Sequence, residues 1–138
     1  MVNNIQEITE DLKQICTKLQ QELEGLDERS IDTILDSRDA DPFDSSWVEA
    51  DKALGQYKAS LSAVEKAAME NLSAEVRRTF FLAVIRATGS SDLAAYVAED
   101  FEIISEMLVS QWVNPFIASM LNSYIAGRIP DSNLELFI

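Results

Sequence analysis

The sequence predicts an all-α protein, a single-domain bundle of six or seven helices. Its 138 residues are close to the usual size of one domain. Apolar residues recur at the three- and four-residue spacing of a helix face in one segment after another. Only 4 glycines and 3 prolines leave little material for the many tight turns of an all-β fold. The chain, residues 1–138, is therefore expected to form one helical domain.

The first predicted element is a long N-terminal helix within residues 1–24. Gly25 follows it as a plausible C-terminal cap. A short second helix is expected over residues 28–37, with its isoleucines and its leucine facing inward. The apolar residues of the first helix alternate spacings of three and four and form one stripe: Ile5, Ile8, Leu12, Ile15, Leu19 and Leu23.

An aspartate-rich loop, DSRDADPFD, is expected at residues 36–44, where Pro42 blocks helix continuation. Ser46 followed three residues later by Glu49 has the pattern of a capping box and predicts the start of the next helix. The residues at helical spacing in that helix are Trp47, Ala50, Leu54 and Tyr57.

Two further helices are predicted between residues 62 and 89. Ser62 and Glu65 form a second capping-box pattern, which opens a helix over residues 63–69. Ser73 is expected to cap a separate helix, and Gly89 is expected to end it.

The last third of the chain predicts two more helices and a tail. Ser91 is expected to cap a helix that runs to residue 110, and Asn114 with Pro115 is expected to begin another, which Gly127 ends. The C-terminal tail, residues 131–138, ends in apolar residues and is expected to dock on the body. The apolar face of the longer helix contains Leu93, Tyr96, Val97, Phe101, Ile104 and Leu108.

One residue type on which many enzymes depend is missing, and another occurs once. The chain has no histidine, which excludes Ser-His and Cys-His catalysis and every histidine metal site. The one cysteine, Cys16, cannot form an internal disulfide, which suits a reducing cytoplasm. The N-terminus has no signal-peptide pattern, and no apolar stretch reaches the roughly 18 residues of a membrane span. We therefore expect a cytoplasmic protein that is not an enzyme and needs no cofactor.

The formal net charge of -13 is concentrated in one segment. Residues 22–51 contain eleven acidic residues against Arg29 and Arg38, a net charge of -9. Two like charges about 6 Å apart cost on the order of 1 kcal/mol at an effective dielectric constant near 40. If the charge served only to keep the protein soluble, the acidic residues could be scattered along the sequence. The clustering favours a basic protein partner and disfavours direct binding to nucleic acid or to a membrane.

The acidic segment is open to three interpretations: a docking surface for a partner, a solvated surface, and a metal site. A calcium loop of the EF-hand type fails, because counting from Asp39 puts Phe43 at position 5 and Asp44 at position 6, where an oxygen ligand and glycine are required. Phe43, beside Pro42, is expected to be an exposed aromatic anchor. The candidate partner-binding residues are Asp32, Asp36, Asp39, Asp41, Phe43, Asp44, Glu49 and Asp51.

Two other groups of charged residues, one of glutamates and one of arginines, are candidates for a functional role. Glu99, Glu102 and Glu106 share one helix face, and paired carboxylates can do acid–base chemistry where burial separates their pKa values. A solvated outer face is the expectation for them. The three arginines of the helix that ends at Gly89 are expected to pair internally with the acidic segment.

Three stretches resemble a known family: DPFDSSWVEA at residues 41–50, ATGSSDLAAYVAEDFEII at 87–104 and VNPFIASMLNSYIAGRIP at 113–130. They are similar to small acidic helical immunity proteins of bacterial contact-dependent inhibition and related polymorphic toxin systems. The likeness covers roughly residues 41–130. It implies a cytoplasmic antitoxin that binds and neutralises one cognate toxin domain, and many such toxins are nucleases with basic clefts.

These observations together predict an immunity-type protein that binds its toxin through the acidic segment, with carboxylates in the place of substrate phosphates. Two alternatives stay open. One is a helical adaptor or chaperone without catalytic activity, dimeric through the first helix. The other is a carboxylate-based enzyme, which would need a deep pocket lined by Glu or Asp.

Overall fold

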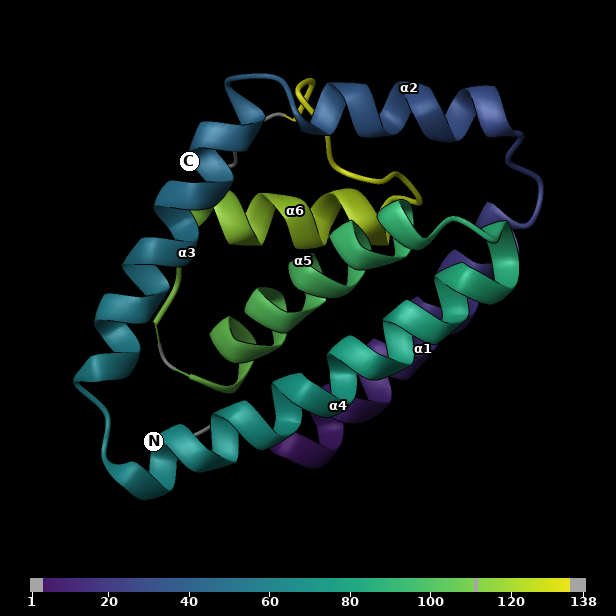
Figure 1. Ribbon diagram of the computed structural model, residues 1–138. Helices are drawn as coiled ribbons and strands as arrows, with labels where there is room; N and C mark the ends of the chain where they lie inside the picture. Colours follow the sequence, from purple (N-terminus) through teal and green to yellow (C-terminus); the bar gives the residue numbers. More distant parts are fainter. Residues whose placement is uncertain (1–3, 111, 135–138) are drawn as a thin grey trace.

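A hairpin of two long helices, α4 (Ala63–Thr88) and α5 (Ser91–Val109), forms the centre of the molecule. Gly89 has a φ of 71°, a left-handed conformation that glycine adopts without strain, and its N–H donates to the carbonyl of Ile85. The Ser90 side chain then accepts the N–H of Leu93 and caps α5. Two residues thus reverse the chain and lay α5 antiparallel along α4 (Figure 1).

The computed structural model describes residues 4–110 and 112–134. These residues form six helices and no strand, which confirms the all-α fold. Helix α1 (Ile5–Leu23) packs along α4 and also contacts α5 and α6, and α2 (Glu28–Arg38) crosses one end of the molecule (Figure 1). Helices α3 (Phe43–Ala59) and α6 (Pro115–Ile125) lie beside α5. Every described helix is too short or too polar to span a bilayer.

The core is built around Phe101 of α5, whose side chain has no exposed surface. Its ring stacks on Phe80 of α4 at 3.6 Å between centroids and lies against Tyr124 of α6 at 4.5 Å. At the other end of α5, Trp112 stacks on Tyr57 of α3 at 5.6 Å. The ring of Phe43 on α3 also lies 5.3 Å from that of Phe116 on α6, so aromatic contacts connect four of the six described helices.

Three residues of the apolar stripe of α1, Leu12, Leu19 and Leu23, belong to the core together with Cys16. Ile8 and Ile15 are partly buried, and Ile5 at the start of the helix is exposed. Burial raises the pKa of the Cys16 thiol, which favours the unreactive protonated form. The adaptor alternative placed dimerisation on this helix, and the oligomeric state stays a prediction.

Several predicted helix boundaries are confirmed. Ser62 and Glu65 form both hydrogen bonds of the capping box. Asn114 caps α6 ahead of Pro115, and Gly127 has the left-handed φ of 84°. Two others shift by one residue: Ser90 rather than Ser91 caps α5, and Glu24 rather than Gly25 is the C-terminal cap of α1.

Two predicted boundaries are wrong. Ser73 does not start a helix, because α4 is continuous through it. Its buried hydroxyl bonds instead to the carbonyl of Glu70 and to the Glu106 carboxylate, so tertiary contacts replace the cap. Helix α3 begins at Phe43 and not after Ser46, because the Asp41 carboxylate accepts the N–H of Ser45 in the first turn.

The start of the predicted tail lies against the body. Leu134 packs on the core, and the Ser132 hydroxyl lies 2.6 Å from that of Ser37 on α2. Residues 135–138 lie outside the described residues, so docking of that part of the tail stays a prediction.

Candidate functional site

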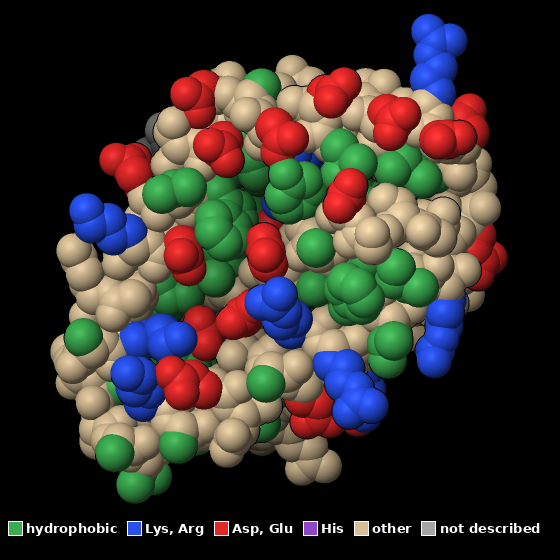
Figure 2. All heavy atoms as spheres, in the orientation of Figure 1, with side chains coloured by type: hydrophobic (Ala, Val, Ile, Leu, Met, Phe, Trp, Pro, Cys, Tyr) green, Lys and Arg blue, Asp and Glu red, His purple; other side chains and the backbone are tan. Residues whose placement is uncertain are grey.

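The eleven acidic residues of residues 22–51 are all exposed. Figure 2 shows acidic side chains gathered over α2 and its junction with α3, whereas most of the lysines and arginines in view lie over α4 and the far end of α3. Carboxylates stay in water when no partner compensates their burial, so this segment keeps its charge at the surface.

Seven of the eight candidate partner-binding residues are exposed. Two are on α2, two are in the turn that follows and three are on α3. This exposed set therefore spans two helices and the turn that joins them. We call it the acidic surface: Asp32, Asp36, Asp39, Asp41, Asp44, Glu49 and Asp51.

Phe43, the eighth candidate, is not exposed, and its interpretation as a surface anchor is wrong. Only 3% of its surface is accessible, and its ring lies 5.3 Å from that of Phe116 on α6. The cause is the early start of α3. Phe43 takes the position one turn before Trp47 and faces inward along with Ala50 and Leu54.

Arg38 also departs from what the sequence suggests, since this arginine is 4% exposed and does not reach the acidic surface. Its two terminal nitrogens bind the two oxygens of Asp100 at 2.6 and 2.7 Å, and one of them also donates to the carbonyl of Pro130 at 3.1 Å. Asp100 lies on α5, outside the acidic segment. Of the two arginines in residues 22–51 only Arg29 is exposed, so the surface these residues present is more negative than their net charge of -9.

Asp100 has no exposed surface and is the centre of a buried network. Besides the two bonds from Arg38, it accepts from Trp47 Nε1 at 2.9 Å and from the Tyr124 hydroxyl at 2.6 Å. Burial and the Asp100 charge raise the pKa of Tyr124, which therefore stays a hydrogen-bond donor. The network connects α2, α3, α5 and α6 and fixes the corner between α2 and α3.

Rings enclose the Arg38 guanidinium, whose carbon lies 4.5 Å from the Phe43 ring centre and 5.1 Å from that of Tyr96. The Tyr96 hydroxyl in turn donates to Asp39 on the acidic surface. That bond is the main cause that raises the pKa of Tyr96, to about 12. Tyr96 thus links the buried Arg38–Asp100 pair to Asp39 of the acidic surface.

Sequence reasoning missed this network, although one signal was present. Asp100 falls three residues after Val97 and one before Phe101, on the apolar face of its helix. An acid at a core position must be paired or hydrogen-bonded, because an isolated buried carboxylate is too costly. The pattern indicates a buried partner for Asp100, but nothing local identifies Arg38, which is 62 residues away.

The glutamates of α5 are not one solvated face. Glu102 pairs with Arg77 of α4 at 2.7 Å near the surface. Glu106 is only 3% exposed and binds Lys58 Nζ at 3.0 Å and the Ser73 hydroxyl at 2.9 Å. The expectation was wrong for Glu106 because α5 is central, with 12 of its 19 residues buried. Arg77 does pair internally, but with α5 and not with the acidic segment.

Burial raises the pKa of Glu106 from its ordinary value of 4.5, although Lys58 and Ser73 oppose this. The Glu106 carboxyl therefore binds its proton more tightly in the folded protein than in the unfolded chain. The stability that this provides is lost as the pH rises from the ordinary pKa of the group through the raised one. The measured quantity is the free energy of unfolding of the wild type minus that of the Glu106→Gln variant. We expect this difference to fall as the pH rises between the ordinary and the raised pKa of Glu106. Urea unfolding at several pH values measures it, and a difference independent of pH from about 4 to 7 would contradict it.

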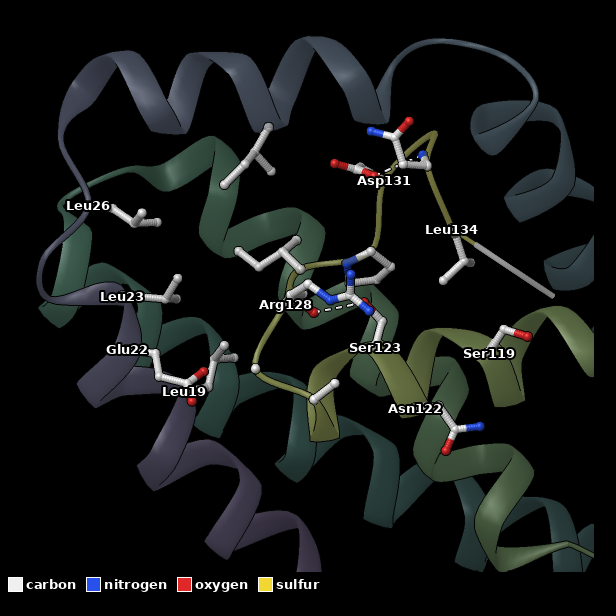
Figure 3. Close-up of a pocket in the computed structure, with 16 residues that line it drawn as sticks. Leu19, Glu22, Leu23, Leu26, Ser119, Asn122, Ser123, Arg128, Asp131 and Leu134 are labelled. Carbon is white, nitrogen blue, oxygen red and sulfur yellow. Dashed lines mark hydrogen bonds between the residues drawn. The ribbon is translucent and has the colours of Figure 1, made fainter. Parts of the chain in front are cut away.

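A pocket of about 610 Å³ lies on another side of the molecule, between the end of α1, α2 and α6 (Figure 3). Leucines and isoleucines line it together with polar residues, and Glu22, Arg128 and Asp131 supply both signs of charge. Gly127 is required here, since a Cβ would lie 3.0 Å from both Glu22 carboxylate oxygens and its φ is positive. The enzyme alternative requires a deep pocket lined by Glu or Asp, and the lining of this pocket contains Glu22 and Asp131 together with Arg128.

The carboxylates do not converge on a point. Within residues 4–110 and 112–134, no three cysteine, aspartate or glutamate side chains are placed to hold a metal ion together. The acidic surface spreads its negative charge over α2, α3 and the turn between them.

Comparison with known proteins places the chain in a family. The family described as Immunity protein PIM1 matches residues 7–131. Comparison with curated proteins and with solved structures gave no match. The matched range covers α2 to α6 in full and α1 from residue 7 onward, and it includes the acidic surface and the Arg38–Asp100 pair. The chain therefore belongs to the Immunity protein PIM1 family.

Proposed function

We propose that this immunity protein neutralises a cognate toxin domain by binding a basic face of it on the acidic surface. The observation that carries the proposal is the exposure of all eleven acidic residues of residues 22–51, while Arg38 is buried beneath them. Folding alone gains nothing from holding these like charges together, whereas a positively charged partner would relieve their repulsion.

The proposed inhibition works by occlusion. A nuclease toxin binds phosphates in a basic cleft, and carboxylates on a rigid helical corner would occupy the same positions. The protein itself performs no catalysis and needs no cofactor in this proposal, and it acts in the cytoplasm. Long-range attraction between the surfaces speeds association at low ionic strength.

Replacing Asp36, Asp39, Asp41 and Asp44 with asparagine tests the proposal. The cognate toxin domain would first be sought by pull-down and as the product of a neighbouring gene. Its association with this variant should slow about tenfold or more at low salt, and the difference should shrink at high salt. The fold should persist, because asparagine oxygens can still accept from Tyr96 and Ser45. Stopped-flow or surface-binding kinetics at several salt concentrations measure the rate.

A matched control removes four exposed acidic residues from α1 and α4, by changing Glu7, Glu10 and Glu75 to Gln and Asp11 to Asn. It changes the net charge by the same amount but leaves the acidic surface intact, so association should stay close to the wild-type rate. An unchanged low-salt rate for the four-asparagine variant would show that the acidic surface is only solvated.

A further inference from the structure

Helix α3 has a broad outward face. Only Phe43, Ala50 and Leu54 of its 17 residues are buried. On the outside, spacings of four, three and four residues produce one stripe along the helix, because residues three or four apart are neighbours on a helix surface. All four members are exposed, and we call them the α3 stripe: Asp44, Val48, Asp51 and Gly55.

Val48 is a large apolar side chain in an acidic setting. It is 56% exposed, and Asp44 and Asp51 lie one turn before and one turn after it. Single exposed valines are common and need no explanation by themselves. A central apolar contact with a charged rim is, however, the arrangement that binding hot spots favour.

Gly55 is the unusual member of the stripe, because neither the backbone conformation nor the packing of the fold requires a glycine at this position. Gly89 and Gly127 are needed for their left-handed backbone, but Gly55 lies inside α3 without a positive φ. A Cβ at Gly55 would meet nothing within 4 Å. Glycine destabilises the middle of a helix relative to alanine, so this position is less stable than the structure allows.

We propose that the α3 stripe is the line along which the toxin domain packs, and that Gly55 is present because the partner's main chain approaches the helix backbone there. This inference rests on the proposed function and makes it more specific. Seven residues separate the two aspartates, which puts them about 10 Å apart along the axis. The partner segment would therefore carry two basic side chains at that spacing, with an apolar contact to Val48 between them. Lys52, exposed beside Asp51, marks the lateral edge of the stripe.

The test uses variants for which stability and binding move in opposite directions. Gly55→Ala and Gly55→Leu should each raise the melting temperature by about 2–4 °C, since both residues form helix better than glycine. They should also weaken binding to the same cognate toxin domain, about tenfold for alanine and more for leucine. Gly25→Ala, at another glycine with open space around its Cβ, is the control and should bind as wild type.

Val48→Ala provides a second measurement on the same complex. It should speed dissociation several-fold with little salt dependence, whereas Val64→Ala, at an 80% exposed valine on α4, should have no effect. If the Gly55 and Val48 variants bind as wild type while the four-asparagine variant associates slowly, the α3 stripe is overturned and the acidic surface stands. If all of these variants bind normally, both proposals are wrong.

Discussion

Replacing Asp100 with asparagine is expected to lower the free energy of unfolding by about 3–5 kcal/mol. Asp100 is fully buried and holds the Arg38 guanidinium with two short bonds. An amide cannot balance the arginine charge, and its NH₂ group would face donors from Arg38, Trp47 or Tyr124. Urea or thermal unfolding at neutral pH measures the change, which is a large share of the roughly 5–15 kcal/mol that stabilises a domain of this kind.

The double variant Arg38→Met with Asp100→Leu separates charge from packing. It removes both charges and should recover part of the lost stability, because no isolated buried charge remains. Recovery should be incomplete, because the Trp47 indole and the Tyr124 hydroxyl lose the carboxylate that accepts their hydrogen bonds. Asp11→Asn, at an exposed position on α1, should change stability by less than about 0.5 kcal/mol. Equal effects of Asp100→Asn and Asp11→Asn would mean that the buried pair does not hold the corner between α2 and α3.

Phe101→Ala is expected to cost about 3–5 kcal/mol. The ring has no exposed surface and lies between Phe80 and Tyr124, so its removal leaves a cavity where α4, α5 and α6 meet. Calorimetry should show a much lower melting temperature, while circular dichroism of the folded variant stays helical.

Two comparisons make that result specific. Phe101→Leu keeps most of the apolar volume and should lose less than half as much stability. Val113→Ala, at a 71% exposed valine, should be nearly neutral. A Phe101→Ala variant as stable as Val113→Ala would show that the aromatic contacts do not support the core.

Local signals explain why the sequence predicts most of the fold. A helix period, a capping box or a glycine after a helix acts within a few residues, so the limits at Ser62, Gly89 and Asn114 can be read without the rest of the chain. Ser73 was also predicted to cap a helix, but it lacks the glutamate three residues later that Ser62 has, and the prediction was wrong. Its hydroxyl has a distant acceptor in Glu106, and the continuous α4 can bury more surface on α5 than two shorter helices could.

For the acidic surface, too, the local features can be predicted from the sequence, whereas the long-range contacts cannot. Exposure of the acidic residues is predictable, because a charged side chain without a partner stays in water. Burial of Arg38 and Phe43 is not, because it depends on Asp100 and Phe116, which reach them only after the helices pack. A charge count along the sequence therefore underestimates how negative the surface is.

Both tryptophans of the protein contact or belong to α3, which has an optical consequence. The Trp47 indole donates to the buried Asp100, and Trp112 stacks on Tyr57 near the other end of the helix. Indole emission depends on the charges and dipoles close to the ring, so the intrinsic fluorescence of this protein reports the position of α3 at both of its ends. A partner without tryptophan that binds the α3 stripe would change this emission, and its arrival could be followed in real time without a label.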